Sequence, residues 1–270
     1  MKKILVFLII FLMISGCTKK EETEDPVIES PGTGEEMEEK ALGWYSFEGK
    51  DLDILLALSD GTGFDWLVVN YSDNLAIGDS SYYVDRSDQP DSTGGSGDWR
   101  MHCSVTDDED AWLILKCARP WEGDGDFQSY LIHQENGQIK EVKRRWDSLF
   151  QDFELVYEKT DEDAIMLNLL KSFEYEVDDK DKLVIKIRPI GEKDYLEIWH
   201  DVDPDMNHKN MEEKRLTITD KEFVMYSDQK NVSFYGPDGI CAKGKISWKD
   251  QYFLDIIKTL DTIRYYSGDE

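Results

Sequence analysis

The sequence predicts a mainly β protein, with an antiparallel β-sandwich followed by a smaller α+β domain. Two observations predict this class. Short runs of alternating apolar and polar residues, such as Trp99–Val105, follow one another up to about residue 140, and turn signals such as Asn136-Gly137 separate them. Helical spacing of apolar residues appears only after about Lys140. The chain therefore divides into an all-β part, residues 41–140, and a mixed part, residues 141–270.

The expected strands of the first part are short, and turn residues bound most of them. They are Asp53–Leu58, Phe64–Tyr71, Leu75–Val84, Trp99–Val105, Ala111–Ala118 and Phe127–His133. Many short strands without interleaved helices favour an antiparallel sandwich. We expect Trp66 and Trp99 to lie in its core.

The second part combines two expected helices with several strands. Apolar residues near 3.6 spacing predict one helix from Thr160 or Asp161 to about Phe173, and another from about Lys249 to Tyr265. The expected strands are Leu183–Pro189, Tyr195–His200, Arg215–Thr219, Phe223–Tyr226, Val232–Tyr235 and Ala242–Trp248.

The charge of the chain limits its partners. Its 270 residues carry a formal net charge of -27. A surface this acidic releases no counterions from a phosphate backbone, so we expect no nucleic-acid partner. It also disfavours adsorption to anionic lipid. A solvated acidic surface is favoured over attraction to a basic partner, which net charge alone does not establish.

The N-terminus has the organisation of a signal peptide. Lys2 and Lys3 precede the apolar segment Ile4–Ile14, which is shorter than the ~20 residues that span a bilayer. Small residues then precede Cys17. This pattern resembles the lipobox of bacterial lipoproteins, which implies cleavage after residue 16 and lipidation of Cys17. The alternative is an ordinary secretory signal with a coincidental cysteine. The expected location is the cell membrane, where the lipid anchors the chain facing the extracellular or periplasmic side.

Residues 17–40 are expected to form a disordered acidic tether. They are rich in Glu and contain Pro26 and Pro31, but they have almost no apolar periodicity. Such a segment cannot bury enough surface to offset its ordering entropy. It would hold the folded part on the order of 25 Å from the membrane.

Three loops between the expected strands are distinctive. The first loop, residues 59–64, reads Ser-Asp-Gly-Thr-Gly-Phe, and the second, residues 94–97, reads Gly-Gly-Ser-Gly. The third loop, residues 119–122, reads Arg-Pro-Trp-Glu. Together they predict a binding edge made of loops and not a catalytic pocket.

In these loops the sequence, from about Gly49 to Ile139, resembles the chagasin-like family of immunoglobulin-fold inhibitors of papain-type cysteine proteases. The family's first loop has Asn-Pro-Thr-Thr-Gly and an aromatic, its second has Gly-x-x-Gly, and its third has Arg-Pro-Trp. The third is intact here. In the first, Ser59, Asp60 and Gly61 stand in place of Asn, Pro and Thr, which predicts a looser loop.

The resemblance implies an immunoglobulin-like antiparallel β-sandwich whose three loops wedge into the cleft of a papain-type cysteine protease, without catalysis and without a cofactor. The residues expected to contact the protease are Gly61, Thr62, Gly63, Phe64, Gly94, Gly95, Gly97, Arg119, Pro120 and Trp121. Glycine lets the backbone approach the protease closely, and Trp121 is a large anchor oriented by Pro120. We expect such an inhibitor to act as a monomer.

Two further patterns leave alternatives open. We expect Cys103 and Cys117 to lie on the core-facing sides of their strands. They form either a disulfide or two buried free thiols, and the sequence favours neither. A run of acidic residues matches four positions of an EF-hand calcium loop, but Met206 replaces its glycine, so a solvated acidic loop is favoured. The four residues are Asp201, Asp203, Asp205 and Glu212.

Two other functions compete with inhibition. One is a non-inhibitory surface-binding lipoprotein that keeps the sandwich only as a scaffold, which the altered first loop favours. The other is a surface hydrolase formed by residues 141–270, which would need convergent acid and base groups in one pocket. The sequence displays no such groups, so we expect no enzyme activity.

Overall fold

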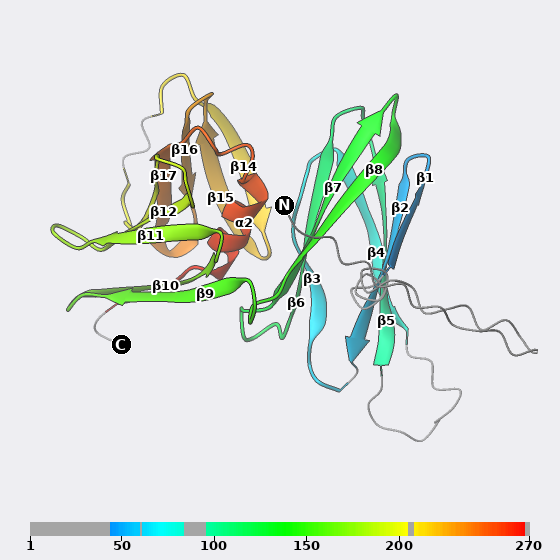
Figure 1. Ribbon diagram of the computed structural model, residues 1–270, viewed down its shortest axis with the longest axis horizontal. Coiled ribbons are helices and arrows are strands. Elements are labelled where there is room, and N and C mark those ends of the chain that lie inside the picture. Colours follow the sequence, from blue (N-terminus) through cyan, green and yellow to red (C-terminus); the bar gives the residue numbers. More distant parts are fainter. Residues whose placement is uncertain (1–43, 60, 84–95, 205–207, 268–270) are drawn as a thin grey trace, which may run out of the picture.

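The computed structural model describes residues 44–59, 61–83, 96–204 and 208–267. The predicted signal peptide, lipidation site Cys17 and tether lie outside these ranges, as do Gly94, Gly95 and Asp205. The described residues are mainly β, with several antiparallel sheets and one short α-helix, α2, near the C-terminus (Figure 1). Within the described ranges, no helix has the length and apolar character needed to cross a membrane.

Residues 44–147 form two four-stranded antiparallel sheets. One sheet has the order β1-β2-β5-β4, with β1 Trp44–Glu48, β2 Asp51–Ser59, β5 Ser96–Val105 and β4 Leu75–Tyr83. The other has the order β3-β6-β7-β8, with β3 Asp65–Tyr71, β6 Ala111–Ala118, β7 Asp126–Glu135 and β8 Gln138–Asp147. Strand β8 spans the boundary predicted at residue 140, and it pairs with β7 as far as Asp147.

One apolar core joins these two sheets. Leu52, Ile54 and Leu56 alternate along β2 and are all buried, because successive side chains of a strand point to opposite faces. They belong to the same core cluster as Leu113 and Leu115 of β6. The expected core tryptophans are confirmed, since Trp66 and Trp99 are both buried and their rings lie 6.4 Å apart.

The remaining residues form two more sheets. The seven-stranded sheet has the order β11-β12-β13-β17-β16-β15-β14, with β11 Phe173–Asp178, β12 Val184–Pro189, β13 Leu196–His200, β17 Ile240–Lys245, β16 Asn231–Tyr235, β15 Lys221–Ser227 and β14 Glu212–Ile218. The three-stranded sheet has the order β18-β10-β9, with β18 Arg264–Ser267, β10 Asp163–Leu170 and β9 Phe153–Lys159. A 3-10 turn, η1 Pro237–Gly239, precedes β17.

The helix predicted from residue 160 to residue 173 is wrong, because this segment contains strand β10. Thr160 does accept backbone N–H groups as a helix cap would, but here it closes the turn between β9 and β10. Side chains on both faces of β10 are buried. The apolar residues of a strand covered on both faces form an almost continuous run, which also contains helical spacings.

The C-terminal helix is confirmed but is shorter than predicted. Helix α2 is Phe253–Thr262, and Ile263 adopts an extended conformation that ends it. The next residues form β18, which pairs with β10. Its apolar stripe, including Ile256, Ile257 and Leu260, is fully buried.

Helix α2 packs against the outer face of the sheet β3-β6-β7-β8. Val69, Ile114 and Phe127 on that face belong to the same core cluster as the stripe of α2, and Figure 1 shows α2 facing this sheet. Two buried ion pairs also cross the interface, Lys116–Asp261 and Lys258–Asp147, with N–O distances of 2.5 Å. The two parts of the chain therefore share a core and a charge network.

The cysteines form no disulfide among the described residues. Cys103, on β5, and Cys117, on β6, are both free thiols, as is Cys241. Burial and the nearby Asp53 carboxylate raise the pKa of Cys103 from 9.0 to about 12. Burial, with smaller contributions from carboxylates, raises the pKa of Cys117 and that of Cys241 to about 11.

These thiols are expected to resist iodoacetamide at pH 8 in the folded protein, because alkylation requires the thiolate. The folded state holds these protons more tightly than the unfolded chain does. Their contribution to the free energy of unfolding is therefore complete below about pH 9 and is lost as the pH rises toward 11 to 12. Mass spectrometry of residues 41–270 with and without urea would count the labelled cysteines. Labelling of Cys103 as fast in the folded protein as in urea would contradict the prediction.

Candidate protein-binding site

Side-chain and backbone contacts hold the first and third loops together. The Arg119 guanidinium donates a hydrogen bond from Nε to the carbonyl oxygen of Thr62, at 3.0 Å. Its Cζ atom also lies 4.8 Å from the centre of the Phe64 ring, a cation–π contact. The first loop joins β2 to β3 and the third follows β6. Arg119 therefore connects the third loop, between two strands of one sheet, to the first loop, which crosses from one sheet to the other.

The first loop depends on glycine for its conformation. Gly61 and Gly63 have φ values of 77° and 78°, in the left-handed region that other residues rarely adopt. A Cβ atom at Gly63 would lie 2.8 Å from the Trp121 ring. The absence of a side chain thus allows the tryptophan of the third loop to lie against the backbone of the first.

The third loop is a tight turn that presents Trp121 to solvent. The Glu122 N–H donates to the Arg119 carbonyl at 3.0 Å, and the Glu122 carboxylate accepts from Arg119 Nη1 at 2.6 Å. The Trp121 side chain is 73% exposed. Burying a large aromatic side chain is strongly favourable, so this exposure means that Trp121 contributes little to the core and remains available to a partner.

The second part of the chain supports the residues that follow the third loop. The Asp124 carboxylate accepts a hydrogen bond from the side-chain amide of Asn168, in β10, at 3.0 Å. The carbonyl of Gly123 accepts from Lys116 Nζ at 3.2 Å, and the same ammonium is paired with Asp261 of α2. Sequence reasoning missed these supports, since no local pattern relates residue 124 to residue 168.

The second loop is only partly described. Gly94 and Gly95 lie outside the described residues, and Gly97 lies in β5 opposite Leu58 of β2. Ser96, where β5 begins, pairs with Ser59, where the first loop begins. The strand that follows the second loop therefore starts beside the first loop.

Three of the four acidic residues of the calcium candidate are described, and they do not form a metal-binding group. The Asp201 carboxylate lies 3.9 Å from Lys182 and accepts a hydrogen bond from the backbone N–H of Asp203. Glu212 begins strand β14 and is exposed. Within the ranges that the structure covers, no three His, Cys, Asp or Glu residues are placed to hold a metal ion.

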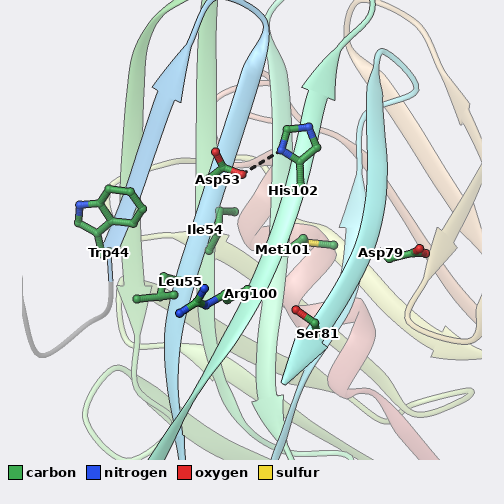
Figure 2. Close-up of a pocket in the computed structure, with 9 residues that line it drawn as sticks. All are labelled: Trp44, Asp53, Ile54, Leu55, Asp79, Ser81, Arg100, Met101 and His102. Atoms are coloured by element: carbon green, nitrogen blue, oxygen red, sulfur yellow. Dashed lines mark hydrogen bonds and ion pairs between the residues drawn. The ribbon is translucent and has the colours of Figure 1, made fainter. Parts of the chain in front are cut away.

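A hollow of about 320 Å³ lies on the outer face of the sheet β1-β2-β5-β4 (Figure 2). His102 Nδ1 lies 2.9 Å from Asp53, and its Nε2 lies 3.6 Å from Asp51. The hydroxyl group in this hollow belongs to Ser81. This residue lies on β4, whereas His102 lies on β5, and Figure 2 shows the two side chains apart. A nucleophile and its base must lie within hydrogen-bond reach. The arrangement in Figure 2 offers no such pair.

The chain matches no protein-family model, no curated protein and no solved structure.

Proposed function

We propose that this protein is an inhibitor of papain-type cysteine proteases, tethered to the membrane, and that its first and third loops enter the protease cleft together. The observation that carries the proposal is the contact of Arg119 with Thr62 and Phe64 beside an exposed Trp121. An interface anchor of this kind is a large aromatic side chain on a rigid support.

The order of the strands supports an immunoglobulin-like sandwich. Lettered A to G along the chain, the strands of one sheet follow the order A-B-E-D, and three strands of the other follow C-F-G. The constant-type immunoglobulin sandwich has its strands in this same order. Strand β8 adds a fourth strand to the second sheet. In this order the first loop joins B to C, the second joins D to E, and the third joins F to G. These three connections lie at the same end of such a sandwich, because B and D run in the direction of F.

Rigidity also supports the proposal. Ordering a flexible loop on binding costs free energy, so a wedge works best when it is formed before the protease arrives. Here Arg119 ties the third loop to the first, and Asn168 supports Asp124. The substitutions at Ser59, Asp60 and Gly61, which predict a looser first loop, are offset in part by these contacts.

The predicted lipid at Cys17 would place this inhibitor on the outer side of the cell membrane. Residues 17–40 would then separate it from the bilayer, where an extracellular protease is accessible. The acidic charge of the chain agrees with a protein held by lipid and not by adsorption.

A direct test is inhibition of a panel of papain-type proteases by residues 41–270. We expect competitive inhibition, because a wedge in the cleft excludes the substrate. A well-folded sample that inhibits none of the panel at micromolar concentration would overturn the proposal. That result would favour the alternative of a non-inhibitory binding protein, for which the altered first loop is the specific observation.

A glycine pair provides a sharper variant. Gly63→Ala is expected to weaken inhibition, because the new Cβ would displace the Trp121 ring from its position 2.8 Å away. Gly49→Ala is the matched control. Gly49 also has positive φ, at 62°, but a Cβ there would meet nothing within 4 Å. Both variants should lose about 1 kcal/mol of stability from the backbone alone. Equal inhibition by the two variants would show that the position of Trp121 is unimportant.

A further inference from the structure

A hollow of about 600 Å³ lies on the outer face of the seven-stranded sheet, away from the loops of the proposed inhibitor site. This volume is typical of a site for a small molecule. Its lining is unusually basic for a chain with a net charge of -27. Four lysines contribute to it: Lys193, Lys209, Lys243 and Lys245.

Strand register places the central groups side by side. Lys243 of β17 pairs with Ser233 of β16 and, on its other side, with Glu197 of β13. Lys245 pairs with Asn231 in the same way. Directly paired residues project from the same face of a sheet. The two ammonium groups, the hydroxyl and the amide therefore surround one patch of the sheet surface.

These lysines have no acidic partner among the residues that the structure describes. No carboxylate there lies within 4.0 Å of the ammonium group of any of the four. The two carboxylates that line the hollow have other contacts. Glu197 lies 3.8 Å from Lys186, and Asp194 accepts from Ser247 Oγ at 3.4 Å. Four lysines against two carboxylates leave the lining with an excess of two positive charges (4 - 2 = 2), and none of the four ammonium groups is held in a close ion pair with a described residue.

A buried hydroxyl in the hollow also lacks a partner. The Ser233 side chain lines the hollow but is only 1% exposed, and its Oγ makes no hydrogen bond within the described chain. Buried polar groups are nearly always hydrogen-bonded, so an exception calls for a ligand or another missing partner. Serine can donate to an anionic oxygen, and a lysine beside it would neutralise the charge.

An aromatic group lies at the rim of the same hollow. His208, which lines it, stacks on Tyr226 with ring centres 4.5 Å apart. Its Nε2 lies 2.7 Å from the hydroxyl of Tyr235. These contacts hold the imidazole in place at the hollow.

We propose that this hollow binds a small organic oxyanion, of about the size of one acidic sugar. Lys243 and Lys245 would contact the carboxylate or phosphate group, and Ser233 would donate a hydrogen bond to it. Carboxylate and phosphate present the same anionic oxygens to these donors. The inference does not depend on the proposed inhibition, because the hollow and the loops are formed by different strands.

Calorimetric titration of the full-length chain, purified in a non-ionic detergent, would test the site. The probes are glucuronate, glucose 6-phosphate and neutral glucose at the same ionic strength. We expect binding of one or both anions and none of glucose. Preference between the two anions would identify carboxylate or phosphate as the natural group. No heat from either anion at 10 mM would overturn the proposal.

Matched variants would locate the binding. Lys243→Gln and Lys245→Gln should each raise the dissociation constant of the anion about tenfold, since each removes a charge-assisted contact. Ser233→Ala should raise this dissociation constant several-fold, while circular dichroism should show an unchanged fold. Lys140→Gln, in β8 of the first part, is the control and should leave binding unchanged. Anion binding that is unaffected by the substitutions at 243 and 245 would also overturn the assignment.

Discussion

Asp261→Asn is expected to destabilise the folded protein by about 3–5 kcal/mol, because it leaves the ammonium of Lys116 buried without a counter-charge. The side chains of Lys116 and Asp261 are each only 3% exposed, and Nζ lies 2.5 Å from the carboxylate. Asparagine preserves the size of the side chain but removes its charge. Lys116 Nζ would keep its hydrogen bond to the carbonyl of Gly123 and its contact with the Phe127 ring, 5.8 Å from the ring centre, and neither carries a negative charge.

Urea unfolding of residues 41–270, followed by tryptophan fluorescence, would measure this loss. Replacing both partners, with Lys116→Met and Asp261→Leu, should restore much of the stability, because a buried ion pair and an apolar pair of similar volume are often equally stable. Glu141→Gln is a control, since its pair with Lys143 is exposed and should contribute little. A loss from Asp261→Asn no larger than that of the control would mean that the Lys116–Asp261 ion pair contributes little to the stability of this interface.

Trp121→Ala is expected to raise the inhibition constant toward a sensitive papain-type protease about thirtyfold, equivalent to about 2 kcal/mol. The side chain is 73% exposed in the free protein, so truncating it should change the stability of the fold little. The loss would instead arise from the apolar surface that the protease no longer buries. Inhibition assays with increasing substrate concentration would separate this effect from a change of mechanism.

The control for Trp121→Ala is Phe47→Ala, another exposed aromatic side chain. Phe47 pairs with Leu52 near the start of β2, whereas the first loop begins where β2 ends at Ser59. It is 39% exposed and lies at the opposite end of that strand from the proposed site. An equal rise in the inhibition constant for both variants would argue against a wedge centred on Trp121.

Local patterns were enough to predict most of the first part of the chain. The period of two along Trp99–Val105 corresponds to a real strand with one face in the core, and both Trp66 and Trp99 are buried as expected. The pairing of Arg119 with the first loop was not predicted as a contact, but the residues concerned were all singled out. Their types were informative because turns and anchors require particular residues.

The same reasoning failed where a strand is covered on both faces. In β10 the residues of both faces are buried, so the alternation that marks a strand is lost. The alternation along β6 turns Ile114 and Lys116 away from the core of the sandwich, on the face opposite to Leu113 and Leu115. Helix α2, more than 130 residues later in the chain, covers that face and buries both side chains.

By itself, then, the sequence determined the mainly β class, most of the strands of residues 44–147 and the residues of the first and third loops, because these follow from period and turn chemistry within a few neighbouring residues. Only the tertiary structure decided that α2 closes the outer face of β3-β6-β7-β8, that Asn168 supports the residues after the third loop, and that four lysines line one hollow on the seven-stranded sheet. Each of these depends on contacts between distant segments. Such contacts form only when burial of apolar surface brings the segments together.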